Sequence, residues 1–378
     1  MLLINSKHTF IKIYRLDNFM CALFTYLTLG FMTTINAHTF TTEQQLTSSY
    51  TNEIATFWKQ GTFEHFIGAN EKRINYATFR QDVNKDTSDI TRKCLVISPG
   101  RRESYLKYKE LSFDFFKLGF DIFIIDHRGQ GLSERLLPNS YKGYVDNFQY
   151  YVVDLAQFIS NIVQPHCDKI DNSSKPYLLA HSMGGAIAAR YLQDYPNTIE
   201  AAVLSSPMFG FNSGGIPKFL AKPLIEVIDQ INQWADNSPW YFFGQNDTSQ
   251  DDFQENLLTH SFIRFQQFSK LYSNTPAIQL GGVTLKWLTE STKALQIIFD
   301  GLDKITTPTL VLQSGADKIV SNTSQNDFCK ELHKVQPQSC PNGKPVIIEN
   351  AYHELFFESD IYRRQALLTV TQWFERHK

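Results

Sequence analysis

Short, nearly continuous apolar runs recur along the chain, with longer amphipathic stretches between them. The runs are Cys94–Ser98, Phe120–Asp126, Pro176–Ala180, Ala201–Ser205, Thr309–Gln313 and Pro345–Glu349. Runs that are apolar at successive positions predict strands buried on both faces, as in a parallel sheet covered by helices. Earlier in the chain, Phe63–Ile67 and Ile74–Phe79 flank Gly68 and predict a β-hairpin.

Helical periodicity fills the stretches between these runs. Apolar residues of 105–118 fall on one helical face, and Gly119 is a natural stop. Residues 145–162 form a second amphipathic stripe, a third helix begins directly after Ser182, and Ile361–Phe374 supplies a last one. Alternating strands and helices predict a mostly parallel, doubly wound α/β fold.

The alternation breaks between about Pro207 and Gly301. This segment has helical stretches, Phe219–Trp234 and Leu257–Tyr272, but no clear strand run. A helical block inserted between two strands of one sheet predicts a cap, or lid, over the active-site face. We therefore expect a helical cap at 207–301, with residues 38–206 and 302–378 forming the core.

The first 37 residues differ from the rest of the chain. A basic stretch at 7–15 precedes the apolar run Phe19–Met32, and small residues lead up to Ala37. This order is the layout of a secretory signal peptide, and the apolar run is short of the ~20 residues that a membrane span needs. We expect export to the periplasm or the medium; an uncleaved anchor, and hence membrane association, is the alternative.

Cleavage at that point would discard Cys21 and leave an even number of cysteines, as exported proteins with disulfides tend to have. Cys329 and Cys340 flank a short polar loop, where a bridge would be local. Cys94 and Cys167 can pair only if the strands beside them are neighbours. Four unpaired thiols are the alternative. No pair has the spacing of a metal site, so neither a metal nor a cofactor is expected.

Composition narrows the classes of function. Apolar residues make up 42% and charged residues 20% of the chain, and the formal net charge is −2. Because there is no basic patch or stripe, we expect no nucleic-acid partner. The 30 Phe residues either fill the core or line an apolar substrate pocket and lid.

The segment Ala180–Gly185 stands where an apolar run meets a predicted helix. It reads Ala-His-Ser-Met-Gly-Gly, with Ser182 between small residues two positions before and two after. A sharp, strained turn from strand to helix exposes the serine hydroxyl, and small neighbours let strand and helix pass closely. This pattern indicates that Ser182 is a nucleophile; a serine that merely caps the helix is the alternative.

An acid and a histidine should follow such a serine in that order. Asp317 lies just past the run Thr309–Gln313, whereas Asp303 precedes the run and Asp327 falls within a predicted helix. We therefore assign the acid to Asp317.

Three histidines follow Asp317 in the chain. His353 comes directly after the last apolar run, in the kind of loop where catalytic residues gather in open α/β sheets. His333 lies in a charged helical stretch, and His377 is next to last. The predicted triad is therefore Ser182, Asp317 and His353, with His353 as the general base.

An oxyanion formed at Ser182 needs backbone N–H donors. One should come from Met183, directly after the nucleophile, and the second from the loop after Cys94–Ser98. In that loop Gly100 allows close approach, so we assign the second donor to the amide of Arg101. The side chains of Arg101 and Arg102 either contact substrate or are solvated.

Several of these segments together resemble the α/β-hydrolases of the monoglyceride-lipase group and, within it, bacterial lysophospholipases. The segments are Pro99–Arg101, Asp126–Ser133, Ala180–Gly185, Gln279–Trp287, Gly315–Asp317 and Tyr352–Glu354. The resemblance covers roughly residues 55–378. It implies a serine hydrolase that cleaves the acyl ester of a single-chain lipid, most of all a lysophospholipid. A monoacylglycerol lipase or a broad carboxylesterase is the alternative, followed by an inactive hydrolase fold that only binds.

The expected cap offers one route to a membrane. Lys218 and Lys222 lie beside apolar residues of Phe219–Trp234, and such a helix can rest on a lipid surface or pack on the core. We therefore include peripheral membrane contact through the cap among the expectations. Acidic residues outnumber basic ones across 207–301, so the cap itself has no evident phosphate-binding field.

Overall fold

The computed structural model describes residues 40–81, 92–170, 174–211, 227–232, 234, 238–247 and 252–377. The expected signal peptide or anchor at 1–37 lies outside the described residues, as does most of Phe219–Trp234. Both expectations therefore stay predictions. Within the described ranges, no helix combines the length and hydrophobicity needed to cross a lipid bilayer.

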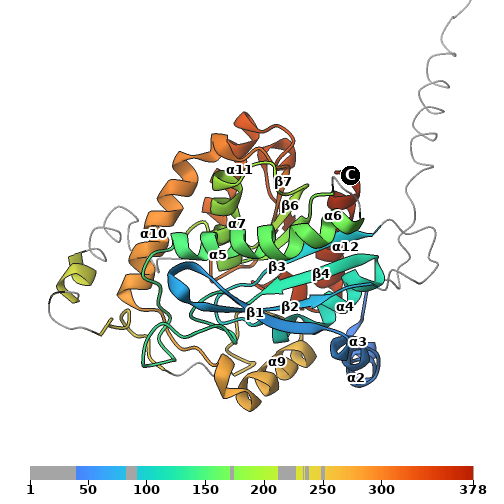
Figure 1. The fold of residues 1–378 in the computed structure, drawn as a ribbon, viewed down its shortest axis with the longest axis horizontal. Helices are drawn as coiled ribbons and strands as arrows, with labels where there is room; N and C mark the ends of the chain where they lie inside the picture. Colours follow the sequence, from blue (N-terminus) through green and yellow to red (C-terminus); the bar gives the residue numbers. More distant parts are fainter. Residues whose placement is uncertain are drawn as a thin grey trace, which may run out of the picture. The chain divides into compact units, whose positions relative to one another are not determined.

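Eight strands of the described residues form one sheet, in the order β1-β2-β4-β3-β5-β6-β7-β8 (Figure 1). They are β1 (Thr62–Ile67), β2 (Arg73–Phe79), β3 (Lys93–Ser98), β4 (Phe120–Ile125), β5 (Tyr177–His181), β6 (Ala202–Ser205), β7 (Thr309–Ser314) and β8 (Val346–Ile348). β1 and β2 form the predicted hairpin, β2 is antiparallel to β4, and every later pair is parallel. The predicted α/β-hydrolase fold with a mostly parallel sheet is confirmed.

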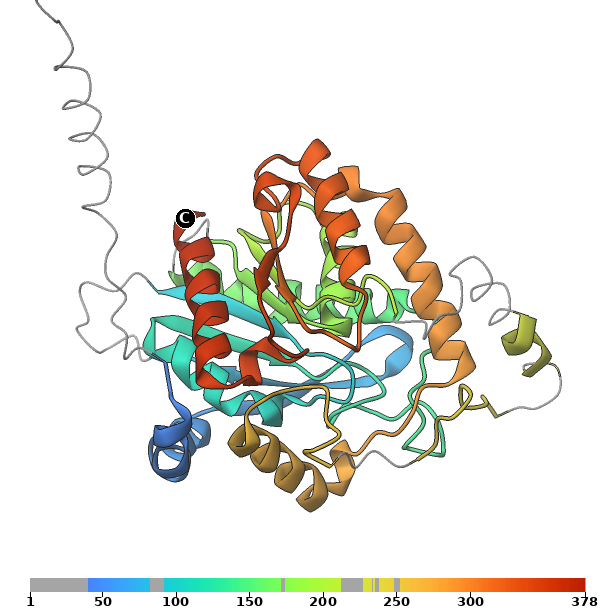
Figure 2. The same ribbon diagram turned by 180° about the vertical axis from the view of Figure 1, so that it is seen from behind.

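Helices cover both faces of this sheet, as Figures 1 and 2 show from opposite sides. They are α2 (Glu43–Thr51), α3 (Glu53–Lys59), α4 (Lys109–Lys117), α5 (Gln149–Phe158), α6 (Gln164–Ile170), α7 (Met183–Asp194), α9 (Phe262–Asn274), α10 (Leu285–Asp300), α11 (Asn322–Val335) and α12 (Asp360–Arg376). α5, α6, α7, α10 and α11 pack on one face, and α2, α3, α4 and α12 on the other. Successive side chains of β3 point to opposite faces of the sheet. Val96 packs in the first helical layer, with α5 and α7, and Leu95 and Ile97 pack in the second, with α4 and α12.

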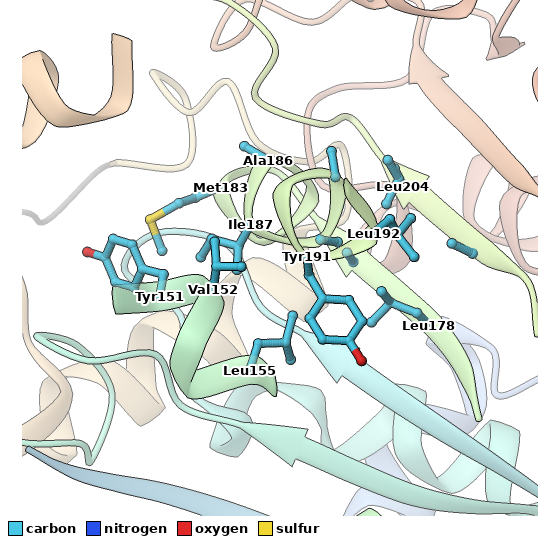
Figure 3. Close-up of a cluster of buried hydrophobic side chains, with 14 of the residues drawn as sticks. Tyr151, Val152, Leu155, Leu178, Met183, Ala186, Ile187, Tyr191, Leu192 and Leu204 are labelled. Carbon is cyan, nitrogen blue, oxygen red and sulfur yellow. The ribbon is translucent and has the colours of Figure 1, made fainter. Parts of the chain in front are cut away.

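The first of these layers anchors α7, the helix that follows Ser182. Val152 of α5 and Ile187 and Tyr191 of α7 are buried in one cluster with Leu178 of β5 (Figure 3). Burying each such large apolar side chain stabilises the fold by about 1.5–3 kcal/mol. The start of α7 is therefore held in place against the sheet.

α9 and α10 lie between β6 and β7, and residues 227–232 of the same stretch are also helical. α9 begins at Phe262, later than the predicted Leu257, because the Ser261 hydroxyl caps it by accepting the Arg264 N–H at 3.2 Å. α10 packs on α7 of the core. The cap boundaries at 207–301 remain a prediction.

Both expected disulfides are present. Cys329 of α11 is bonded to Cys340, and Cys94 of β3 to Cys167 of α6. β3 and β5 are hydrogen-bonded neighbours, as the second pairing required. The alternative of four unpaired thiols is therefore wrong.

Candidate active site

Ser182 forms the sharp turn between β5 and α7. Its backbone has φ 51° and ψ −116°, a strained conformation for a residue with a side chain. Its N–H donates to the Ser205 carbonyl at 3.0 Å, and its carbonyl accepts the Met208 N–H at 2.9 Å. The chain at and beyond the end of β6 therefore holds the strained turn that the sequence predicts.

Small residues near Ser182 let two loops meet. A Cβ on Gly184 would collide with the carbonyl oxygens of Ser98 and Pro99. A Cβ on Gly100 would lie 3.2 Å from the Cβ of Ser182. The loop after β3 thus packs directly against the serine turn, which only glycine allows at these two positions.

His353 bridges Ser182 and Asp317. Its Nε2 lies 2.9 Å from the Ser182 Oγ, and its Nδ1 lies 2.8 Å from the Asp317 Oδ2. All three side chains are buried. With the Nδ1 proton donated to Asp317, the Nε2 lone pair faces the serine hydroxyl and can accept its proton. The structure thus brings the three residues singled out in the sequence into one hydrogen-bonded chain.

Backbone amides hold the Asp317 carboxylate in place. Its Oδ1 accepts the N–H groups of Ile319 at 2.8 Å and Val320 at 3.1 Å. Burial opposes the negative charge, but attraction and hydrogen bonding from His353, together with these amides, lower the pKa of Asp317 below its ordinary value. Asp317 is therefore ionised at neutral pH, where it orients the imidazole.

The other acids and histidines considered from the sequence lie elsewhere. Asp303 and Asp327 are exposed. His333 and His377 each hydrogen-bond a backbone carbonyl of their own segment. None of the four lines the cavity at Ser182.

The loop after β3 and the start of α7 each supply a backbone amide near Ser182, those of Arg101 and Met183. The Gly100 N–H donates to Glu103 at 2.5 Å, so the first uncommitted amide of that loop is that of Arg101. Met183 opens α7, where the first amides have no intrahelical acceptor. In the part of the chain that the structure describes, no acceptor takes the N–H of either residue. These are the two amides that the sequence assigns to the oxyanion.

A buried ionic network beside these loops was not predicted. The Glu103 carboxylate accepts hydrogen bonds from Tyr108 at 2.6 Å and Lys107 at 2.8 Å, and it lies 3.2 Å from the Nδ1 of His181. Lys107 also donates to Glu354 at 2.5 Å. Burial opposes these charges, yet Lys107 and His181 lower the pKa of Glu103 well below its ordinary value, and Glu103 raises that of His181. The spacing of Glu103 and Lys107 is the only signal in the sequence, and it is a common one.

The side chains of Arg101 and Arg102 both line the cavity at Ser182. The Arg101 Nη1 donates to the Gly281 carbonyl at 2.9 Å, and its guanidinium lies 5.9 Å from the centre of the Trp287 ring. The Arg102 guanidinium lies 5.7 Å from the centre of the Tyr272 ring. Both side chains are partly buried and face the cavity, so the choice between substrate contact and solvation stays a prediction.

A cavity of about 720 Å³ opens onto Ser182 and His353. α9 and the segment before it supply most of its apolar lining: Phe253, Leu257, Leu258, Phe262, Phe265, Phe268 and Leu271. Such a volume suits a small organic molecule, and this wall suits an apolar chain. Among the described residues, no group of three or more His, Cys, Asp or Glu side chains is placed to hold a metal ion.

Comparison with known proteins supports the resemblance seen in the sequence. Residues 89–360 match the sequence profile of the family described as "Serine aminopeptidase, S33". The chain is 38% identical to lysophospholipase L2 of Escherichia coli strain K12, over 86% of this chain and 90% of that protein. It is 33% identical to the probable lysophospholipase L2 of Haemophilus influenzae, over 85% and 94%. With human monoglyceride lipase it shares 26% identity, over 75% and 82%.

Solved structures share the fold. A soluble variant of monoglyceride lipase from Saccharomyces cerevisiae superposes with a TM-score of 0.61 at 17% identity, covering 84% of this chain and 95% of that one. Monoacylglycerol lipase from Paleococcus ferrophilus gives a TM-score of 0.59 at 19% identity, covering 81% and 99%. The family profile, the relatives and the fold agree, and the chain belongs to the serine aminopeptidase S33 family of α/β-hydrolases, in the group that contains lysophospholipase L2 and the monoglyceride lipases.

Proposed function

We propose that this chain is a carboxylic ester hydrolase that cleaves the acyl ester of a single-chain lipid, most of all a lysophospholipid. The observation that carries the proposal is the hydrogen-bonded chain Ser182–His353–Asp317 at an apolar cavity. An ester carbonyl beside Ser182 meets a nucleophile, a base and two backbone amides at once.

The reaction follows from this geometry in two halves. The Ser182 Oγ attacks the ester carbonyl carbon while His353 takes the hydroxyl proton, and Asp317 stabilises the imidazolium. The N–H groups of Arg101 and Met183 donate to the oxyanion, each contributing about 3–4 kcal/mol to transition-state stabilisation. The alcohol leaves with the proton from His353, and the acyl group stays on Ser182.

Water then releases the acyl group. His353 removes a proton from a water molecule, the hydroxide oxygen attacks the acyl carbon, and the bond to the Ser182 Oγ breaks. The proton returns to Ser182 and a fatty acid leaves. The site needs no group beyond these side chains and amides for either half.

The choice of substrate rests on two supports. Relatives named lysophospholipase L2 match most of the chain, and aromatic residues of α9 line the cavity. Relatives named monoglyceride lipase favour a second candidate, a monoacylglycerol lipase or broad carboxylesterase. The contacts among Ser182, His353 and Asp317 speak against the third, a catalytically inactive binding module.

A fluorophosphonate probe tests the proposed nucleophile. We expect the folded protein to be labelled at Ser182, and Ser182→Ala to lose both the label and, by roughly six orders of magnitude, kcat. Ser206→Ala is the matched control, because Ser206 is also a buried serine with positive φ, 42°. A folded wild-type protein that does not label would favour the binding module.

Substrate profiling then separates the first two candidates. The protein is given lysophosphatidylcholine, the monoacylglycerol with the same acyl chain, and a short-chain nitrophenyl ester. We expect the fastest release of fatty acid from the lysophospholipid. Release from monoacylglycerol but not from lysophosphatidylcholine would make the lysophospholipid assignment wrong.

We propose, further, that the protein is exported and meets its lipid at a membrane surface. The basic, apolar and small segments of residues 1–37 and the two disulfides support export, because disulfides persist in oxidising compartments. Leu257 and Phe262, which line the cavity, are 43% and 50% exposed, and this supports peripheral contact. Co-sedimentation with phospholipid vesicles tests the contact, which Leu257→Asp should weaken.

A further inference from the structure

Arg101 holds an uncompensated positive charge in the active-site cavity. Its side chain contacts the carbonyl oxygen of Gly281 and the ring of Trp287, and neither neighbour carries a charge. Among the described residues, no carboxylate is paired with Arg101, and the neighbours that act on its charge are Arg102 and two tyrosines. Arg101 is only partly exposed to solvent, and a cation that has lost part of its hydration is stabilised when an anion joins it.

Other cations of the same cavity are compensated within the protein. Lys107 bridges Glu103 and Glu354, and Arg264 is paired with Glu110 at 2.8 Å. These side chains therefore have their charges satisfied without a ligand.

Arg102 lies beside Arg101 at the same end of the cavity. Burial, followed by repulsion from Arg102, lowers the pKa of Arg101 to about 10. Both arginines follow Gly100, in the loop that packs against Ser182. Arg101 therefore lies at the end of the cavity that adjoins the reacting ester, while apolar side chains of α9 line much of the rest.

We infer that Arg101 is a specificity-determining residue that receives the phosphodiester of a lysophospholipid while its acyl ester lies at Ser182. The inference rests on the proposed ester hydrolysis. A guanidinium matches two phosphate oxygens with parallel N–H donors, and among the described residues Arg101 donates only through its Nη1. In a lysophospholipid the glycerol carbons and one oxygen separate the ester from phosphorus, a span comparable to one arginine side chain. A monoacylglycerol has a hydroxyl in place of the phosphate and leaves the charge uncompensated.

The test is the ratio of kcat/KM for lysophosphatidylcholine to kcat/KM for the monoacylglycerol of the same acyl chain, both below their critical micelle concentrations. Arg101→Met keeps the backbone amide and most of the apolar stem but removes the charge. We expect the ratio to fall about 10- to 100-fold, the range of one charge-assisted hydrogen-bond pair. Loss of folded protein lowers both activities in proportion and leaves the ratio unaffected.

Arg135→Met is the matched control. Arg135 also tethers the segment before α10, donating to the Ala277 carbonyl at 2.8 Å and the Gln279 carbonyl at 3.1 Å, but it does not line the cavity. For Arg135→Met the ratio of the two kcat/KM values should stay within about twofold of the wild-type ratio, since no charge near the substrate changes. A purely structural role for Arg101 would make the two variants behave alike.

The outcomes separate the two proposals. A wild-type protein that hydrolyses neither lipid overturns the proposed function before any variant is made. An active wild type whose ratio is unchanged by Arg101→Met overturns the role of Arg101 alone. Should Arg101→Met not fold, Arg101→Lys carries the test: an ammonium cannot form the bidentate contact, so the ratio should fall severalfold, and an unchanged ratio overturns the inference.

Discussion

Glu103 and His181 lie 3.2 Å apart through the Oε2 of one and the Nδ1 of the other. The Nε2 of His181 lies 3.3 Å from the His353 carbonyl, and the same Oε2 of Glu103 accepts the Gly100 N–H. With Nδ1–H and Nε2–H both donating, His181 carries a positive charge that Glu103 balances. The pair thereby joins the loop before Arg101 to the loop that carries His353.

Glu103→Gln should destabilise the protein by about 3–5 kcal/mol, because Lys107 and His181 lose the carboxylate they share in a buried site. The free energy of unfolding in urea measures this. Glu331→Gln is the control: Glu331 forms an exposed pair with Lys334, and its loss should have no measurable effect. If the two variants lower the free energy of unfolding equally, the buried network stabilises the protein no more than an exposed ion pair does.

Asp317→Asn should remove a pH-dependent part of the stability. Because the pKa of Asp317 is lowered on folding, its carboxylate stabilises the fold above the unfolded-state pKa of about 3.9, and this contribution is lost as pH falls through the folded-state pKa. The difference in free energy of unfolding between wild type and variant should therefore be largest at neutral pH and shrink in acid. Asp327→Asn, the same substitution at an exposed acid, is the control.

The same Asp317→Asn variant should lower kcat about 10⁴-fold, since the amide no longer selects the tautomer with Nε2 as acceptor. Steady-state hydrolysis of a nitrophenyl ester measures this, with Asp303→Asn as the control at an exposed acid. A kcat within tenfold of wild type would remove Asp317 from the proposed mechanism.

Of the two disulfides, Cys94–Cys167 should contribute more to stability. The sequence separations are 73 and 11 residues, and closing the longer loop removes more entropy from the unfolded chain. Replacing both cysteines of a pair by alanine should cost about 4 kcal/mol for Cys94–Cys167 and about 3 kcal/mol for Cys329–Cys340 on this entropic account. Urea unfolding of the two double variants measures both losses of stability. A larger loss on removing Cys329–Cys340 would contradict the prediction.

N-terminal sequencing of the protein produced in a bacterium tests the leader. We expect the mature chain to begin directly after Ala37 and to occur outside the cytoplasm. Replacing the apolar residues of Phe19–Met32 with charged ones should keep the full-length chain inside the cell. Recovery of the intact chain in the membrane fraction would instead support an uncleaved anchor.

Features that depend on local pattern were predictable from the sequence alone. The strands after residue 92 agree with their apolar runs to within a residue or two, because strands covered on both faces are built mostly from apolar residues. The edge strand β8 is the exception in burial, since its Ile347 is exposed. The order of Ser182, Asp317 and His353 was readable because each stands directly after a strand, and the carboxyl ends of parallel strands meet at one edge. Gly184 could be recognised as a close-packing position for the same local reason.

Only the tertiary structure decided how side chains distant in sequence meet. Glu103 and His181 are ordinary residues in the sequence, and their roles depend on contacts between the β3 loop and the serine turn. Nothing in the sequence indicates that the Arg101 side chain contacts the Gly281 carbonyl and the Trp287 ring, which lie far along the chain. Periodicity tells which face of an element is buried, but it does not tell which partner a polar side chain meets, since that depends on loops whose paths the whole fold sets.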